Sequence, residues 1–142
     1  MKKILIINAT YYKNVSSNLT IGALKRLKNI RCLVNQLNVP GVFEIPVTIM
    51  KNIKKYDGFI ALGCVIKGQT PHFNYICEST FNGIMKIAIE NSKPIGNGII
   101  TCNNKKQAIA RSSNFKDKSK KNKGFEAANA LISILDNDIK RK

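Results

Sequence analysis

Short apolar runs alternate along this chain with segments whose apolar residues recur at helical spacing. Runs rich in β-branched residues predict strands over residues 3–8, 32–37, 56–66 and 94–101. Apolar positions three and four residues apart predict helices over 19–27, 44–54, 72–91, 103–111 and 125–139. Residues 56–66 lack a strict alternation, which is typical of an interior strand covered on both faces. Ser16 or Ser17, Thr70, and Asn103 or Asn104 are candidate helix caps, and Pro71 fits a first helical position.

This regular alternation of strand and helix predicts an α/β fold. With 142 residues and 44% hydrophobic composition, we expect one domain spanning 1–142. The expected architecture is a three-layer αβα sandwich on a four-stranded parallel sheet. Residues 112–123, which are polar and rich in lysine, are expected to form an exposed loop between the last two helices.

Ligands of open parallel sheets bind beyond the carboxyl ends of the strands. The segments expected there are 9–14, 40–44, 65–72 and 101–104, so the site can be located before its chemistry is known. His72, the one histidine, is the side chain best suited to proton transfer near neutral pH, although a structural role fits a lone histidine equally well. The preceding residues 68–70 offer backbone N–H groups at a helix N-terminus, which is a weak indication of an anion site.

Three further side chains at this edge are open to two interpretations. Glu44 follows a Pro-Gly turn and an aromatic residue, and it is either a ligand-binding carboxylate or a first-turn residue stabilised by the helix dipole. Tyr11 and Tyr12 are ordinary loop aromatics or a stacking surface for a planar ring. Arg111 matches a phosphate bidentately, or it forms a salt bridge.

The charge balance is the unusual feature of the composition, with 24 Lys and Arg against 8 Asp and Glu and a net charge of +16. Nucleic-acid binding is one explanation. The excess is mostly lysine and accompanies abundant asparagine and isoleucine, a bias that AT-rich codon usage also produces. The aromatics are not interleaved with basic residues as a single-strand binding surface would need.

Other classes of function lack a supporting pattern. No apolar run is long enough to span a membrane and no cleavable signal is present, so we expect a cytoplasmic protein. The four cysteines form no zinc-binding spacing and are expected to be buried, reduced thiols. Glycine-rich dinucleotide and phosphate loops, nucleophile elbows and HExxH motifs are missing from the sequence. We therefore expect neither a cofactor nor a metal.

Four segments resemble the lumazine synthase family in order and spacing. They are 40–46 (PGVFEIP), 62–73 (LGCVIKGQTPHF), 97–101 (NGIIT) with Gln107, Ala108 and Arg111, and 122–124 (NKG). The resemblance covers almost the whole chain and implies a flavodoxin-like fold. It also implies the penultimate step of riboflavin biosynthesis, in which 5-amino-6-(D-ribitylamino)uracil and 3,4-dihydroxy-2-butanone 4-phosphate give 6,7-dimethyl-8-ribityllumazine, phosphate and water. No cofactor or metal takes part in that transferase reaction.

The resemblance also implies a role for each matching residue. Tyr11 would stack on the pyrimidine ring and His72 would transfer protons. The ribityl chain of the substrate would be held by Val42, Phe43 and Glu44, and the floor of the ring pocket would be formed by Val65 and Ile66. The phosphate would be bound by Gln69, Thr70 and Arg111. A neighbouring subunit of a pentamer would complete each site with Asn97, Arg111 and Lys123.

The chain departs from the family pattern at three places. Tyr11 stands where Phe or Trp is usual, Thr10 stands where Arg is common, and residues 112–122 form a longer and more basic linker. Because a short glycine-containing linker accompanies the sixty-subunit shells of some relatives, we expect a pentamer or a pair of pentamers here. The expected partners are small-molecule substrates and further copies of this chain, with no nucleic acid and no membrane.

Two alternatives remain open from the sequence alone. A small nucleic-acid-binding domain would use residues 116–123, and its affinity would fall steeply with salt. The related archaeal type of riboflavin synthase would share the fold and act on the lumazine product. The segment around His72 argues against the second alternative.

Overall fold

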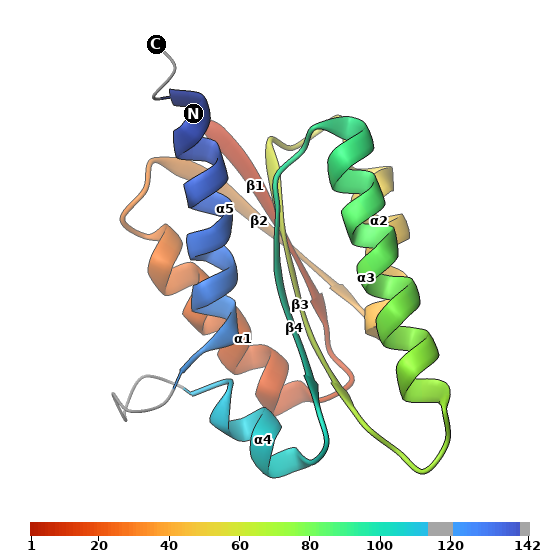
Figure 1. Ribbon diagram of the computed structural model, residues 1–142. Helices are drawn as coiled ribbons and strands as arrows, with labels where there is room; N and C mark the ends of the chain where they lie inside the picture. The colour runs from red at the N-terminus through yellow and green to blue at the C-terminus, as the bar shows by residue number, and fades with distance from the viewer. Residues whose placement is uncertain (114–120, 140–142) are drawn as a thin grey trace.

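The computed structural model describes residues 1–113 and 121–139 and has a four-stranded sheet at its centre (Figure 1). Its strands are β1 (Lys2–Ala9), β2 (Cys32–Val39), β3 (Gly58–Ile66) and β4 (Ile95–Cys102). They pair in the order β2-β1-β3-β4, and every pairing is parallel. The predicted α/β fold is therefore confirmed, and the apolar strand β3 lies inside the sheet as expected.

Helices cover both faces of the sheet, which gives the expected three layers (Figure 1). On one face lie α1 (Lys13–Leu27), α4 (Lys105–Ala110) and α5 (Lys123–Ile139). On the other face lie the 3-10 turn η1 (Val42–Glu44), α2 (Ile45–Lys51) and α3 (His72–Asn91). None of the helices in the described part of the chain has the length and apolar character needed to cross a membrane.

Strand β1 shows how the sheet holds the two helical layers. Ile4 and Ile6 pack on the layer of α1 and α5, whereas Leu5 and Ile7 pack on the layer of α2 and α3. All four side chains are fully buried. Because successive side chains of a strand point to opposite faces, a strand buried on both sides reads as a continuous apolar run.

The predicted start of α1 is wrong, whereas α3 spans His72–Asn91 as predicted and differs only in the position of its proline. Helix α1 begins at Lys13, so Ser16 lies inside it, where its Oγ donates to the Lys13 carbonyl at 3.3 Å and caps nothing. Ser16 is buried, and its carbonyl oxygen accepts from the Asn8 side chain at 3.1 Å. At α3, Pro71 occupies the cap position rather than the first helical position, although the Thr70 hydroxyl still accepts from the His72 N–H at 3.4 Å.

The predicted exposed loop before α5 is also wrong at both of its ends. Ser112 forms an antiparallel bridge with Asn122, and both residues are buried, as is Ser113. The lysines at 116, 118 and 120 lie outside the described residues. Cys64 and Cys102 are buried as expected, whereas Cys32 and Cys77 are only half-buried, and all four cysteines are free thiols.

Candidate active site

The connections that follow β1, β2 and β3 meet around one cavity of about 450 Å³, which we call the aromatic pocket. Its lining comes from Tyr11, Tyr12, Gly41, Val42, Phe43, Glu44, Cys64, Val65, Ile66, His72 and Ile76. The carboxyl ends of all four strands point to this end of the molecule, the lower end in Figure 1. Seven of the predicted site residues are thus brought together from segments far apart in the sequence.

Two tyrosines form one wall of the aromatic pocket. The rings of Tyr11 and Tyr12 meet edge to face, with centroids 4.9 Å apart and an interplanar angle of 76°. Tyr12 packs against the core beneath α1, and burial raises the pKa of its hydroxyl. The Tyr11 side chain is 75% exposed. Tyr12 therefore anchors a ring whose own surface remains available to a planar ligand.

The floor of the pocket is neutral and closely packed. Burial raises the pKa of the Cys64 thiol to about 12, with a further contribution from neighbouring Cys102. This thiol therefore stays protonated at neutral pH, which makes it a poor nucleophile. At Gly63, a Cβ atom would lie only 2.6 Å from the Val42 side chain. A glycine is required there because β3 and η1 approach so closely.

Glu44 has a structural contact and a free oxygen. Its Oε1 accepts from the Gly41 N–H at 3.0 Å, which closes the turn that precedes α2. Its backbone carbonyl accepts from the Thr48 hydroxyl at 2.7 Å. Among the described residues, no hydrogen-bond donor reaches its Oε2. The side chain lines the aromatic pocket. Both interpretations of Glu44 from the sequence therefore fit the structure.

His72 is the first residue of α3, and its exposed side chain lines the aromatic pocket. Gln69 and Thr70 precede it in the β3–α3 connection and are exposed, but they line none of the cavities found in the described chain near His72. The adjoining Gly68 has no heavy atom within 4 Å of where a Cβ would stand. This connection therefore presents its polar groups outward, beside the pocket that contains the imidazole.

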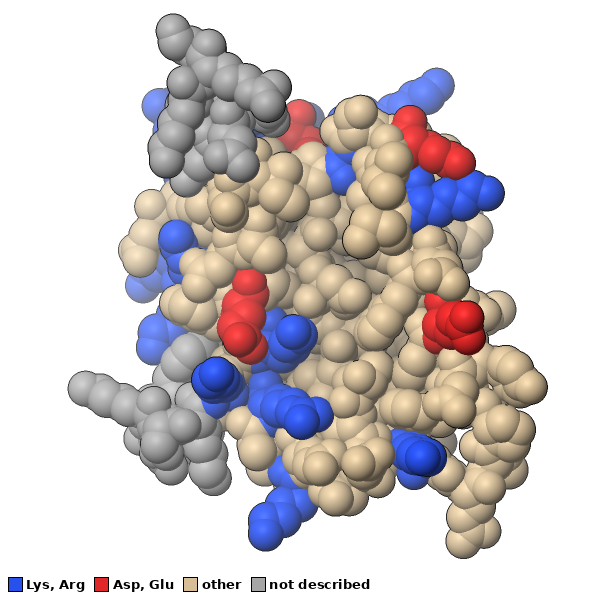
Figure 2. Space-filling model, in the orientation of Figure 1, with Lys and Arg blue, Asp and Glu red and all other residues tan. Residues whose placement is uncertain are grey.

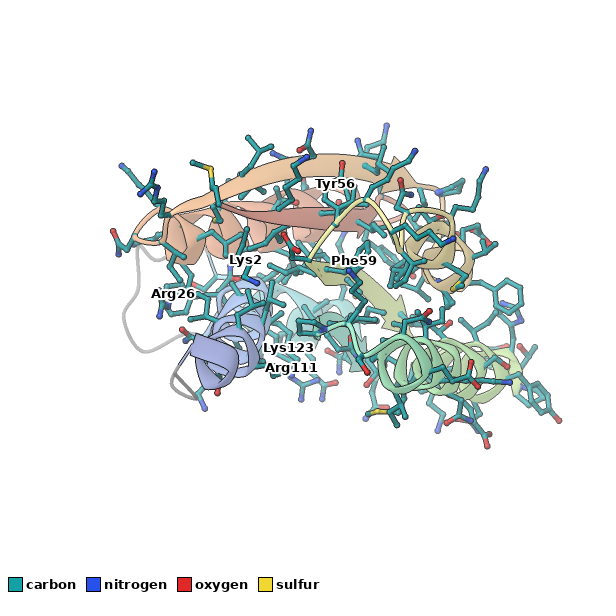
Figure 3. The ribbon with its side chains drawn as sticks, turned by 90° about the horizontal axis from the view of Figure 1, so that it is seen from above. Lys2, Arg26, Tyr56, Phe59, Arg111 and Lys123 are labelled. Atoms are coloured by element: carbon teal, nitrogen blue, oxygen red, sulfur yellow. The ribbon has the colours of Figure 1, made fainter. Side chains whose placement is uncertain are left out.

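The remaining predicted site residues line a second cavity of about 270 Å³, the basic pocket. It is lined by Phe81, Asn97, Ile99, Ile100, Thr101, Arg111 and Lys123. Figure 3 shows Arg111 and Lys123 side by side, and the Lys123 N–H donates to the Arg111 carbonyl at 2.8 Å. Arg111 also donates from Nη1 to the Thr101 carbonyl at 3.1 Å. Two cations thus converge at the end of β4.

The two pockets have no lining residue in common. Between α3 and α5 runs a hollow with a mainly apolar surface, visible as the tan region at the centre of Figure 2, with basic side chains below it. Asn97 and Phe81 line both this groove and the basic pocket. One chain by itself therefore keeps the imidazole and the two cations in separate cavities.

Several pocket residues escaped the sequence analysis. In the aromatic pocket they are Cys64 and Ile76, and in the basic pocket Phe81. All three are apolar residues of a strand or helix whose sequence pattern indicates only burial. Tyr12 carried the same signal as Tyr11 but matched no role. Adjacency to a candidate residue was the only available indication for Cys64, which directly precedes Val65.

Comparisons with known proteins show the family of this chain. The sequence profile described as 6,7-dimethyl-8-ribityllumazine synthase matches residues 1–138. A protein of that name from Bartonella henselae is 39% identical over 136 residues, which cover 93% of this chain and 85% of the relative. Proteins of the same name from Cutibacterium acnes and Corynebacterium kroppenstedtii are 37% and 36% identical, covering 94% and 92% of this chain and 80% of each relative. The chain therefore belongs to the 6,7-dimethyl-8-ribityllumazine synthase family.

Proposed function

We propose that this chain condenses 5-amino-6-(D-ribitylamino)uracil with 3,4-dihydroxy-2-butanone 4-phosphate to form 6,7-dimethyl-8-ribityllumazine, phosphate and water. The enzyme would be a transferase of riboflavin biosynthesis that works in the cytoplasm, where its four free thiols remain reduced. The observation that carries the proposal is the gathering of Tyr11, Glu44 and His72 around one pocket in a chain of this family.

The aromatic pocket suits the pyrimidine substrate. The exposed ring of Tyr11 offers a face for stacking, and Val65 and Ile66 form an apolar floor beneath it. A ribityl chain carries several hydroxyl groups, so it needs hydrogen-bond partners at the edge of the pocket. We assign this task to the stretch Val42, Phe43 and Glu44, in which the free Glu44 carboxylate oxygen accepts from a hydroxyl.

The basic pocket suits the phosphate of the second substrate. Arg111 offers a planar fork of donors and Lys123 adds a second positive charge beside it. Gln69 and Thr70 lie in the outward-facing connection next to His72, and we assign their backbone and side-chain donors to the same phosphate. These donors would also stabilise the charge of the phosphate as it leaves.

The proposed chemistry needs proton transfers more than a strong nucleophile. Forming an imine between the amine and the ketone, eliminating phosphate and closing the ring each move a proton, which suits an imidazole at neutral pH. His72, at the edge of the aromatic pocket, is assigned this role. Holding two substrates together contributes further, up to ~7 to 11 kcal/mol where the geometry is ideal.

We further propose that a complete site forms only where two chains meet in a pentamer. The aromatic pocket of one chain would face the basic pocket of its neighbour, which supplies Asn97, Arg111 and Lys123. The separation of the two pockets within one chain supports this arrangement. Exposed apolar side chains of α3, such as Met85 and Ile89, would be covered in the same contact.

The test is an assay with both purified substrates, followed by the absorbance and fluorescence of the lumazine product. The proposal expects product only when both substrates are present, together with one released phosphate for each lumazine formed. A matched preparation carrying His72→Gln, which preserves hydrogen bonding but cannot exchange a proton at neutral pH, serves as the control. If the wild-type chain forms no lumazine under these conditions, the proposed function is wrong.

A further inference from the structure

Asn122 is a buried polar side chain that joins three separate segments of the chain. It is 3% exposed. Its Nδ2 donates to the Asn18 carbonyl of α1 at 2.9 Å and to the Ser113 carbonyl at 2.8 Å. Its Oδ1 accepts from the Phe125 N–H at 3.0 Å, which caps the first turn of α5. Both donor hydrogens and one acceptor site of this amide are thus used.

The surroundings of Asn122 leave room for this side chain and for little else. A Cβ atom on Gly22 would lie 2.0 Å from the Asn122 Oδ1 atom. A Cβ atom on Gly124 would lie 2.0 Å from the carbonyl oxygen of Leu19. The N-terminal turn of α5 therefore lies directly against α1, and two glycines permit this contact on either side of the amide.

Asn122 also closes the segment that connects α4 to α5. Residues 112 and 122 form the antiparallel bridge, and the Ser113 N–H donates to the Lys121 carbonyl at 3.1 Å. The next hydrogen bond in this series joins the Lys123 N–H to the Arg111 carbonyl at 2.8 Å. The two cations of the basic pocket therefore flank this short ladder. Arg111 directly precedes Ser112 on one strand, and Lys123 directly follows Asn122 on the other.

We propose that Asn122 is a positioning residue that sets the spacing of Arg111 and Lys123 for binding the substrate's phosphate. The proposal rests on the function proposed above. Arg111 follows α4 and Lys123 begins α5, and the hydrogen bond from the Lys123 N–H to the Arg111 carbonyl joins the two backbones beside the bridge. The Asn122 amide ties the bridge that joins their backbones to α1, and the spacing of the two charges follows from that tie.

The chemistry of the side chain makes the proposal specific to asparagine. Serine at 122 keeps an oxygen that can cap α5 but has no amide donors for the carbonyls of Asn18 and Ser113. Asn122→Ser therefore separates the positioning role from the capping role. Asn91→Ser is a matched control, because Asn91 also donates from Nδ2 to a backbone carbonyl, that of Ile87 at 2.8 Å, at the far end of α3.

The experiment compares wild type, Asn122→Ser and Asn91→Ser in steady-state assays with each substrate varied in turn. For Asn122→Ser we expect the KM of the phosphorylated ketone to rise about tenfold, as expected when charged contacts to a phosphate are misaligned. The KM of the pyrimidine should change less than about twofold, since Asn122 lies outside the aromatic pocket. Equal rises for both substrates, or no rise for the ketone, would overturn the proposal. Asn91→Ser should leave both constants near wild type.

A second variant addresses the case in which Asn122→Ser does not fold. Gly22→Ala favours helix α1 by propensity, yet its methyl group occupies the space of the Asn122 amide. The same selective rise in the KM of the ketone is expected, and an unchanged KM would count against the proposal. The dissociation constant of inorganic phosphate, measured by calorimetry for wild type and variant, separates this inference from the proposed function. A wild-type chain that makes no lumazine overturns the function, whereas equal phosphate affinity in wild type and variant overturns the positioning role.

Discussion

The aromatic pocket and the basic pocket lie at the same end of the sheet but are built differently. The aromatic pocket is formed by three strand-to-helix connections and combines two tyrosines, an apolar floor, one carboxylate and one imidazole. The basic pocket is smaller and is formed by β4 together with residues from α3 and α5 and with Arg111, which follows α4. Arg111 and Lys123 give it two positive charges at the end of β4.

This difference matches the difference between the two proposed substrates. A planar, uncharged ring gains from stacking and apolar contact, whereas a phosphate gains from fixed cationic donors. Separating the two environments on one chain keeps the imidazole of His72 away from the cations of the same chain. The comparison predicts that substitutions in each pocket affect different substrates, which the following variants test.

His72→Ala should have the largest effect, lowering turnover about ten- to a thousand-fold, within or just below the range of general acid–base groups. Binding of both substrates in proximity remains, so activity should not vanish. The measurement is kcat at saturating substrates, with circular dichroism to confirm folding. An unchanged kcat would remove His72 from the proton transfers and leave it a structural residue at the start of α3.

Arg111→Ala should come next, raising the KM of the phosphorylated ketone about 10- to 150-fold, as expected for loss of a charge-assisted contact. The KM of the pyrimidine should stay near wild type. Arg26→Ala is the matched control, because Arg26 donates to Asn129 and lines neither pocket. Equal loss of affinity for both substrates would indicate that Arg111 acts through the structure rather than through the phosphate.

Tyr11→Ala should show the opposite selectivity and a smaller effect. Loss of a stacking contact should raise the KM of the pyrimidine about two- to tenfold. Tyr11→Phe should restore it, since the ring is retained. Tyr75→Ala removes a similarly exposed tyrosine of α3 from outside both pockets and should change neither constant. A rise in the KM of the ketone alone would contradict the assignment of Tyr11.

The assembly should be insensitive to salt. We expect a species of about five or ten chains by sedimentation velocity at both low and high ionic strength. The linker at 112–122 is long and basic, and screening its repulsion does not shorten it. The lysines at 116, 118 and 120 lie outside the described residues, so this expectation rests on the sequence. A particle of megadalton mass under both conditions would contradict it.

The fold followed from the sequence because its signals are local. The β-branched runs of β1 and β3 and the helical spacing in α3 are readable from neighbouring residues alone. The start of α1 was missed because the mostly polar residues 13–18 suggest a loop, whereas in the structure Asn8 donates to the Ser16 carbonyl and to the Thr20 hydroxyl of that helix. Such contacts between distant residues leave no mark on local spacing.

The site was predictable only in part for the same reason. The segments that meet in the aromatic pocket could be named, because strand ends of a parallel sheet share one edge. The separation of Asn97, Arg111 and Lys123 into another cavity depends on where α4 and α5 pack, and only the family resemblance implied that these residues serve a neighbour's site. The buried amide of Asn122 was read as part of an exposed lysine-rich loop.

The central claim is that each complete site combines the aromatic pocket of one chain with the basic pocket of another. The direct test is to co-express His72→Ala with Arg111→Ala and assay the mixed assemblies at a ketone concentration below the wild-type KM. Random mixing of equal amounts should leave about a quarter of the sites with two intact halves, and activity should recover accordingly. Activity no higher than that of the two variants assembled separately and then combined would show that each chain forms its site alone.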